Sequence, residues 1–222
     1  APVDSLFPLP DSLDFETAAA LPLQGLTAYG LVHFGAAIRA GQTVLVQAAG
    51  GGVGLLAVQL ARLAGARVLG TASSESKRAA IARVGGEPFE YGDDLAERIR
   101  AATAGRGVDV VLDSVGRVTQ TLSLDCLAPF GLLVHYGEAS GPAAPLEIDR
   151  LYDRSLRVSA YLVNSEHPAG AFDQARRHLV ELAASGALVL TIDTVLPLEQ
   201  AAEAHRRLES RAAAGKVLLR VA

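Results

Sequence analysis

The sequence predicts an α/β protein built on a doubly wound parallel sheet, with segments at both ends that belong to a partial second domain. Six short runs of apolar and β-branched residues alternate with longer helical patterns through most of the chain. Strands that are apolar on both faces and joined by helices form parallel sheets covered on each side. A glycine-rich turn follows the first run and opens the first helix, which is typical of the Rossmann arrangement.

The predicted elements follow one another in a regular order. Strands are expected at residues 43–48, 66–72, 88–91, 108–115, 131–137 and 156–163. Helices are expected at residues 14–21, 26–34, 51–65, 73–85, 93–105, 117–129 and 168–186. Asp14 is the expected N-cap of the first helix, and either Ser73 or Ser74 caps the helix at 73–85. The residues from 191 onward are expected to form a strand, a helix and a final strand.

Composition excludes several classes of protein. The 222 residues have a formal net charge of -4 and no basic run, which argues against nucleic acid as a partner. No apolar run is long enough to cross a bilayer, and no secretory leader is visible, so no membrane association and a cytoplasmic location are expected. The single cysteine, Cys126, fits a reducing compartment. The five histidines lack ligand spacing, so no metal site is expected.

The stretch QAAGGGVG, residues 47–54, lies between the first predicted strand and the helix that follows it. Glycines at such a turn let the backbone approach a phosphate, and the helix N-terminus supplies unpaired N–H groups. From Ala49 the frame reads A-x-G-x-x-G, a variant of the dinucleotide-binding pattern with alanine as its first residue. The context therefore predicts a dinucleotide site. A turn that only packs helix on strand, and an S-adenosylmethionine site, are the alternatives.

The end of the second strand indicates which dinucleotide is bound. Enzymes that use NAD usually have an acidic residue there, which binds the ribose 2′-hydroxyl. This chain instead has Thr-Ala-Ser-Ser at residues 71–74, followed by Lys77 and Arg78. Hydroxyls and cations suit a 2′-phosphate, so NADPH is the expected cofactor. Glu75 argues against this interpretation, and an ordinary helix cap with a solvated face is the alternative.

Five stretches together resemble the medium-chain dehydrogenase/reductase superfamily. They are LPLQGLTAYGLV, AGQTVLVQAAGGGVGLLAVQLARLAGARVLGTASSESK, GRGVDVVLDSVG, HYGEASG and the ending GKVLLRV. They occur in the order of that family and cover nearly the whole chain. The branch most similar to them is the zinc-free, zeta-crystallin-like NADPH:quinone oxidoreductases. The N-terminal GroES-like barrel of that branch is expected to be missing here.

The resemblance implies roles for residues in the matching stretches. It implies that the pyrophosphate lies on the backbone of Gly51, Gly52, Val53 and Gly54. It implies 2′-phosphate contacts from Ser73 and Lys77, with Arg211 nearby. It places Tyr91 near the adenosine, and Thr27, Gly137 and Leu162 near the nicotinamide. An ordinary strand-end role for Tyr91, and a bond from Thr27 back to its own helix, are the alternatives.

The activity implied by the resemblance is hydride transfer from NADPH to a quinone or another conjugated carbonyl compound (an enone). No catalytic side chain is assigned. His135, at the end of a predicted strand, is the one side chain considered as a proton donor, although a lone histidine at such a position is usually structural. Water and the missing N-terminal region are the other expected sources of the proton. Two other functions stay open, an enoyl reductase domain of a polyketide or fatty-acid synthase and a non-catalytic NADPH-binding protein.

The resemblance also divides the chain into three segments. Residues 1–30 are expected to be a remnant of the catalytic domain with its connecting helix, and residues 31–165 the NADPH-binding Rossmann domain. Residues 166–222 are expected to hold the last helix of that domain and a strand–helix–strand unit that returns to the catalytic domain. Exposed sheet edges invite pairing, so a homodimer is expected through residues near Val158–Val163.

Overall fold

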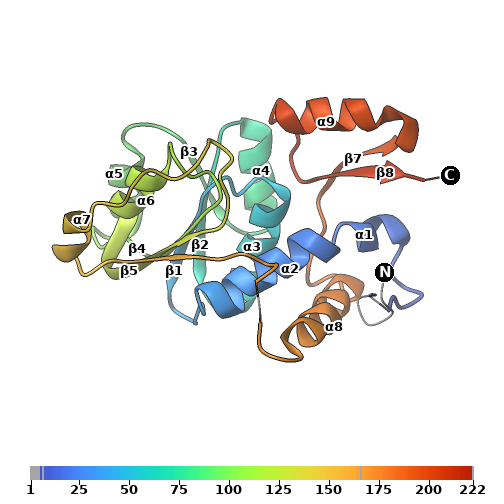
Figure 1. Ribbon diagram of the computed structural model, residues 1–222, viewed down its shortest axis with the longest axis horizontal. Helices are drawn as coiled ribbons and strands as arrows, with labels where there is room; N and C mark the ends of the chain where they lie inside the picture. The colour runs from blue at the N-terminus through green and yellow to red at the C-terminus, as the bar shows by residue number, and fades with distance from the viewer. Residues whose placement is uncertain (1–5, 7, 166, 222) are drawn as a thin grey trace.

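The computed structural model of the chain describes residues 6, 8–165 and 167–221. A six-stranded parallel sheet lies at the centre, with its strands in the order β3-β2-β1-β4-β5-β6 (Figure 1). The strands are β1 (Thr43–Val46), β2 (Arg67–Ala72), β3 (Glu87–Glu90), β4 (Val108–Asp113), β5 (Leu127–His135) and β6 (Arg157–Ala160). This is the strand order of the Rossmann fold, so the predicted doubly wound parallel sheet is confirmed.

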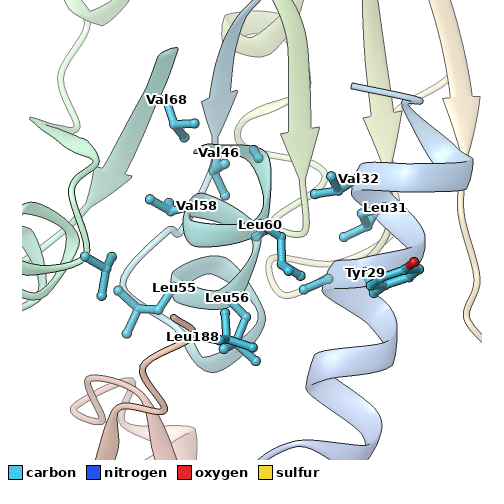
Figure 2. Packing of buried hydrophobic residues seen from close by; sticks show 14 of the residues in the cluster. Tyr29, Leu31, Val32, Val46, Leu55, Leu56, Val58, Leu60, Val68 and Leu188 are labelled. Carbon is cyan, nitrogen blue, oxygen red and sulfur yellow. The ribbon is translucent and has the colours of Figure 1, made fainter. Parts of the chain in front are cut away.

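Helices cover both faces of the sheet, and the side chains of each strand alternate between them. One face carries α2 (Pro22–Gly30), α3 (Gly52–Leu63), α4 (Glu75–Arg83) and α8 (Ala171–Ala184), and the other carries α5 (Leu95–Ala102) and α6 (Gln120–Cys126). In β1, Val44 and Val46 pack on the first face and Leu45 packs on the second. Figure 2 shows part of the first cluster, including Leu55, Leu56, Val58 and Leu60 of α3. Each such side chain contributes about 1.5–3 kcal/mol when it is fully buried.

The first two helices begin at a capping side chain and at a proline, respectively. The Asp14 carboxylate accepts the Thr17 N–H at 2.8 Å, which confirms the predicted cap of α1 (Phe15–Ala19). The helix predicted at residues 26–34 starts earlier, because Pro22 is tolerated in the first turn of α2. It then continues as the π-helical turn η2 (Leu31–Gly35).

The helix predicted at residues 117–129 is too long. The turn after β4 contains Gly116 with a φ of +88°, and α6 begins only at Gln120. Residues 127–129 already belong to β5. The short helix α7 (Asp149–Tyr152) was not predicted from the sequence.

The strand predicted at residues 156–163 ends at Ala160, so the expectation that Leu162 lies on it is wrong. The reason is the packing of Tyr161 on η2 and the end of α2. A Cβ atom built at Gly30 would lie 1.7 Å from the Tyr161 hydroxyl, and one at Gly35 would lie 3.2 Å from its ring. The Tyr161 N–H still donates to the His135 carbonyl oxygen of β5 at 2.9 Å while its ring packs over the two glycines, and the residues after it no longer follow the sheet edge.

The last residues form a separate C-terminal unit, drawn in orange-red and red in Figure 1. It consists of β7 (Ile192–Pro197), the short 3-10 turn η3 (Leu198–Gln200), α9 (Ala201–Glu209) and β8 (Lys216–Arg220), with the two strands parallel. The predicted strand, helix and strand are thus confirmed. The Asp193 carboxylate holds the unit together, accepting from Arg207 Nε at 2.5 Å and from the Ala214 N–H at 2.9 Å. The division of the chain into three domains stays a prediction.

The helices of the described residues are too short, or too polar, to cross a membrane.

Candidate functional site

A cavity of about 590 Å³ lies beyond the carboxyl ends of β1, β2 and β4. In a sheet of this strand order, ligands bind at this edge, where the connections diverge to opposite faces. The walls come from the turn after β1, the start of α4, the turns after β3 and β4, and the C-terminal unit. Six of the residues predicted for the site line this cavity: Gly51, Gly52, Ser73, Lys77, Tyr91 and Arg211.

The cavity has further lining residues that the sequence analysis did not assign to it. Gln24 reaches it from α2, and Leu208, Ala213 and Gly215 reach it from the C-terminal unit. Val115, Val118 and Leu122 form an apolar wall after β4. The others are Ala48, Gly50, Ala72, Gly92, Asp93, Thr119 and Ala139. An apolar wall beside cationic and glycine-lined walls suits a ligand that combines a flat ring with phosphate groups.

The glycines of the turn after β1 have different roles. A Cβ atom at Gly54 would lie 2.6 Å from Ala49 Cα and 2.7 Å from its carbonyl oxygen, so this glycine is required for packing α3 on the turn. A Cβ atom at Gly51 would meet only the Ala48 carbonyl oxygen at 3.4 Å, an ordinary contact. Packing within the protein therefore does not require Gly51. The missing side chain there leaves space on the cavity side.

The start of α3 is suited to an anion. Gly51 is its N-cap residue, and no side chain of the described residues caps the helix. Uncapped N–H groups and the positive end of the helix dipole favour negative charge at this position. The turn itself is held by Tyr91, whose hydroxyl accepts the Ala48 N–H at 2.9 Å. Burial raises the pKa of Tyr91, which keeps its phenol neutral at physiological pH.

Serines follow the end of β2, where an NAD-binding site would have an acid, and Lys77 lies in the first turn of the helix after them. Ser74, rather than Ser73, caps α4 by accepting the Lys77 N–H at 3.4 Å, which leaves Ser73 exposed at the cavity. Lys77 Nζ donates to the Arg211 carbonyl oxygen at 2.5 Å. Burial lowers the pKa of Lys77, and Arg211 adds to that effect while Asp193 opposes it.

Arg211 connects the C-terminal unit with the loop after β5, and both of these segments line the cavity. It has a positive φ of 57°, at the turn between α9 and β8. Its guanidinium donates to the Ala139 carbonyl oxygen at 2.9 Å, in the loop that follows β5. Lys77 and Arg211 together make this end of the cavity positive.

A buried hydrogen-bond network beneath the cavity fixes the strand ends. The Asp113 carboxylate accepts from the N–H groups of Val115 and Gly116 at 2.8 and 3.1 Å. It also accepts from the hydroxyls of Thr119 and Ser123. Ser123 in turn accepts from the Gln47 amide at 3.1 Å, and Gln47 accepts from Thr71 at 2.7 Å. The network links the ends of β1, β2 and β4 and sets the floor of the cavity.

Five of the predicted residues do not line the cavity, namely Thr27, Val53, Gly54, Gly137 and Leu162. The Thr27 hydroxyl donates to the Leu23 carbonyl oxygen of its own helix at 2.7 Å, which is the alternative weighed for it. Gly137 lies against the Ser114 backbone, and the Leu162 side chain is exposed. Their expected nicotinamide contacts stay predictions.

His135, the candidate proton donor, also lies outside the cavity lining. Its position at the end of β5 pairs it with Asp113 in the strand register. Its Nε2 atom is buried and makes no hydrogen bond to any described residue. Because His135 does not line the cavity, a catalytic role for it is not proposed.

Comparison with known proteins agrees with this geometry. Residues 86–219 match the family model described as zinc-binding dehydrogenase. The chain is also 39% identical to the quinone oxidoreductase of Pseudomonas aeruginosa over 221 residues, which is 97% of this chain and 68% of that protein. The chain belongs to the zinc-binding dehydrogenase family. The predicted resemblance to medium-chain oxidoreductases, and to their quinone oxidoreductase branch, is therefore confirmed.

Other known proteins are similar to all or part of the chain. A 2-haloacrylate reductase from Burkholderia sp is 35% identical, covering 98% of this chain and 68% of its own length. The crystal structure of Escherichia coli quinone oxidoreductase complexed with NADPH superposes with a TM-score of 0.88 at 37% identity, covering 95% of this chain and 67% of that one. A highly reducing polyketide synthase from Aureobasidium melanogenum is 42% identical over 141 residues, 61% of this chain.

The name of the zinc-binding dehydrogenase family raises the question of a metal. Within the described residues, no group of three or more histidine, cysteine, aspartate or glutamate side chains is placed to hold a metal ion. The one cysteine, Cys126, is buried, and burial raises the pKa of its thiol to about 12. The described residues therefore do not fit a zinc ion.

Proposed function

We propose that this chain binds NADPH in the cavity at the ends of β1, β2 and β4, and acts as an oxidoreductase that reduces a quinone or another conjugated carbonyl compound. The observation that carries the proposal is the combination of open glycines and cations. Gly51 leaves space at the N-terminus of α3, which no described side chain caps. Lys77, shortly after β2, and Arg211, from the C-terminal unit, add positive charge to the same cavity, whereas an NAD site would have an acid at the end of β2.

Different residues of the cavity bind different parts of the cofactor. The turn at Gly51 and Gly52 accommodates the pyrophosphate, and Ser73, Lys77 and Arg211 bind the 2′-phosphate. The apolar wall at Val115, Val118 and Leu122, together with Tyr91, accommodates the adenine ring. When bound, the cofactor supplies a hydride through its nicotinamide.

The class of acceptor is proposed from the relatives. They are named for reduction of a quinone and of a 2-haloacrylate. A quinone has ketone carbonyls conjugated with carbon–carbon double bonds, and a 2-haloacrylate has a carbon–carbon double bond conjugated with a carboxylate. In both, a hydride can add to the conjugated system. Thr27, Gly137 and Leu162 are proposed to flank the nicotinamide, as the resemblance implies. The enoyl reductase role is the second candidate, supported by the similarity to a polyketide synthase.

The test is a calorimetric titration with NADPH and NADH, followed by an absorbance assay of NADPH oxidation. The assay uses three acceptors in parallel: a benzoquinone, 2-chloroacrylate and an enoyl thioester. We expect tighter binding of NADPH than of NADH, with oxidation by the quinone or the haloacrylate. Turnover with the thioester alone would support the synthase role instead. Tight NADPH binding without oxidation by any acceptor would support a non-catalytic NADPH-binding protein.

We also propose that the chain forms a homodimer through β6, the last strand of the sheet, and that it is located in the cytoplasm. β6 ends the strand order, and Val158 on it is 38% exposed. A free edge of this kind can pair with a second copy. Sedimentation should give the mass of a dimer for the parent chain and the mass of a monomer for the Val158→Lys variant. Equal masses would exclude pairing through this strand.

A further inference from the structure

One acidic side chain, Asp93, lies in the wall of the large cavity. Among the described residues that line this cavity, it alone carries a negative charge, whereas Lys77 and Arg211 carry positive charge. It follows β3 and stands two residues before Leu95, the first residue of α5. A carboxylate beside a ligand with several phosphate groups is unfavourable unless it accepts a hydrogen bond from that ligand. The position of Asp93 therefore indicates a donor group on the ligand.

The backbone on each side of Asp93 is held in place. Before it, the Tyr91 hydroxyl accepts the Ala48 N–H at 2.9 Å, which ties the chain after β3 to the turn after β1. After it, the Leu95 N–H donates to the Gly92 carbonyl oxygen at 3.1 Å, and the Leu95 side chain is fully buried. The exposed side chain of Asp93 is therefore carried on a fixed turn at the edge of the cavity.

The carboxylate of Asp93 is available to a ligand. The arginines of the adjoining helices already have partners, since Arg78 pairs with Glu90 at 3.2 Å and Arg98 pairs with Asp94 at 3.0 Å. Within the part of the chain that the structure describes, no residue makes an ion pair or a hydrogen bond with the Asp93 carboxylate. Both of its oxygen atoms can therefore accept hydrogen bonds from a bound molecule.

The residues that line the cavity with Asp93 indicate which part of a nucleotide it would meet. Tyr91, two residues before it, and the apolar wall at Val115, Val118 and Leu122 are the surfaces proposed for the adenine ring. A flat ring on such surfaces is oriented by polar groups at its edge. An ionised carboxylate only accepts hydrogen bonds, and the exocyclic amine is the one donor group of the adenine ring in a nucleotide. The chemistry of the two groups is therefore complementary.

We propose that Asp93 selects adenine as the base of the nucleotide, by accepting a hydrogen bond from the exocyclic amine while the ring lies on Tyr91 and the apolar wall. This inference rests on the proposed binding of NADPH and adds how the base is recognised. The same carboxylate would repel the carbonyl oxygen that hypoxanthine or guanine carries at this position. The recognition is shared by NADPH and NADH, because both contain adenine.

The test changes one group on the protein and one on the nucleotide. In the hypoxanthine analogue of NADPH, a carbonyl oxygen takes the place of the adenine amine. Calorimetry should show that the parent chain binds NADPH about tenfold more tightly than this analogue. Asp93→Ala should weaken NADPH binding about tenfold without weakening the binding of the analogue, so that the preference disappears. Glu97→Ala, which removes a carboxylate from the first turn of α5 outside the cavity, is the control and should keep the preference.

Simple repulsion predicts the opposite result for Asp93→Ala. NADPH carries several negative charges, so loss of a carboxylate that makes no contact with it would strengthen the binding of both nucleotides. Stronger binding of NADPH by this variant, or equal affinity of the parent chain for NADPH and the analogue, would overturn the inference. So would an equal loss for the two nucleotides, because the carboxylate would then meet the ribose. Failure of the parent chain to bind NADPH at all would instead refute the proposed function, and the inference with it.

Discussion

The ammonium group of Lys77 donates a hydrogen bond to the backbone carbonyl oxygen of Arg211 at 2.5 Å. The two residues are far apart in the sequence, and both line the cavity at its positive end. An ammonium group has three donors, so Lys77 can keep this bond and still donate to a phosphate. The bond therefore holds the lysine in place without using up its capacity to bind a ligand.

Replacing Lys77 should change which nucleotide is preferred. We expect Lys77→Met to weaken NADPH binding about tenfold to a hundredfold, the range for hydrogen bonds to charged groups. NADH, which lacks the 2′-phosphate, should bind almost as before. Arg78→Met is the matched control, because Arg78 pairs with Glu90 at 3.2 Å and does not line the cavity. Calorimetry with both nucleotides measures the effect, and an equal loss in the two variants would refute the assignment.

Two glycines of one turn should respond in opposite ways to alanine. Gly54→Ala places a Cβ atom against the Ala49 backbone, and we expect it to lower the free energy of unfolding by about 1–3 kcal/mol. Gly51 has a φ of -84°, which alanine adopts readily, so Gly51→Ala should unfold like the parent chain. Its methyl group should nevertheless obstruct the phosphate and weaken NADPH binding. Urea unfolding and calorimetry on both variants test this. A loss of stability at Gly51 equal to that at Gly54 would mean that both glycines serve packing.

The network around Asp113 should be important for stability. Asp113→Ala leaves two N–H groups and two hydroxyls without their acceptor, and we expect a loss of about 3 kcal/mol or more. Ser123→Ala removes fewer bonds from the same network and should cost about 1 kcal/mol. The free energy of unfolding in urea provides the comparison. Similar losses for the two variants would contradict the central position of the carboxylate.

The C-terminal unit should lose stability in acid. Burial alone would raise the pKa of Asp193, but the hydrogen bonds from Arg207 and from the Ala214 N–H outweigh burial and lower it. A carboxyl group with a lowered pKa contributes stability that is present above its unfolded value of 3.8 and lost as the pH falls through its folded value. Asp193→Asn should therefore be less stable than the parent chain at pH 7, and the difference should shrink below about pH 4. Urea unfolding across this range measures it, and a constant difference would contradict the linkage.

Local patterns were sufficient to predict the sheet. Runs such as TVLV at residues 43–46 are buried on both faces, and the glycines at 50–54 mark the turn that opens the first long helix. The sequence also predicted that Ser73 and Lys77 lie at the cavity, because they come within five residues of the end of β2; their phosphate contacts stay a prediction. In both cases the deciding residues are close in the sequence.

Features that depend on contacts between distant segments were not predictable. Gln24 reaches the cavity only because α2 packs beside α3, and Gly215 does so only because the C-terminal unit returns to the turn after β1. The end of β6 depends on how Tyr161 packs over Gly30. A strand-end acid followed by a glycine, as in Asp113 to Gly116, was the sequence feature that could have revealed the buried network.

Gly51, in the turn after β1, forms a parallel β-bridge with Gly215, at the start of β8 in the C-terminal unit. This contact has a consequence for how the protein folds during synthesis. The six strands of the sheet are complete by residue 160, yet one wall of the cavity consists of Leu208, Arg211, Ala213 and Gly215. Chains emerge from the ribosome with the N-terminal end first, so the sheet can form before this wall exists. This wall of the cavity is therefore completed after the sheet, and we expect the proposed nucleotide site to form only once the C-terminal unit has docked.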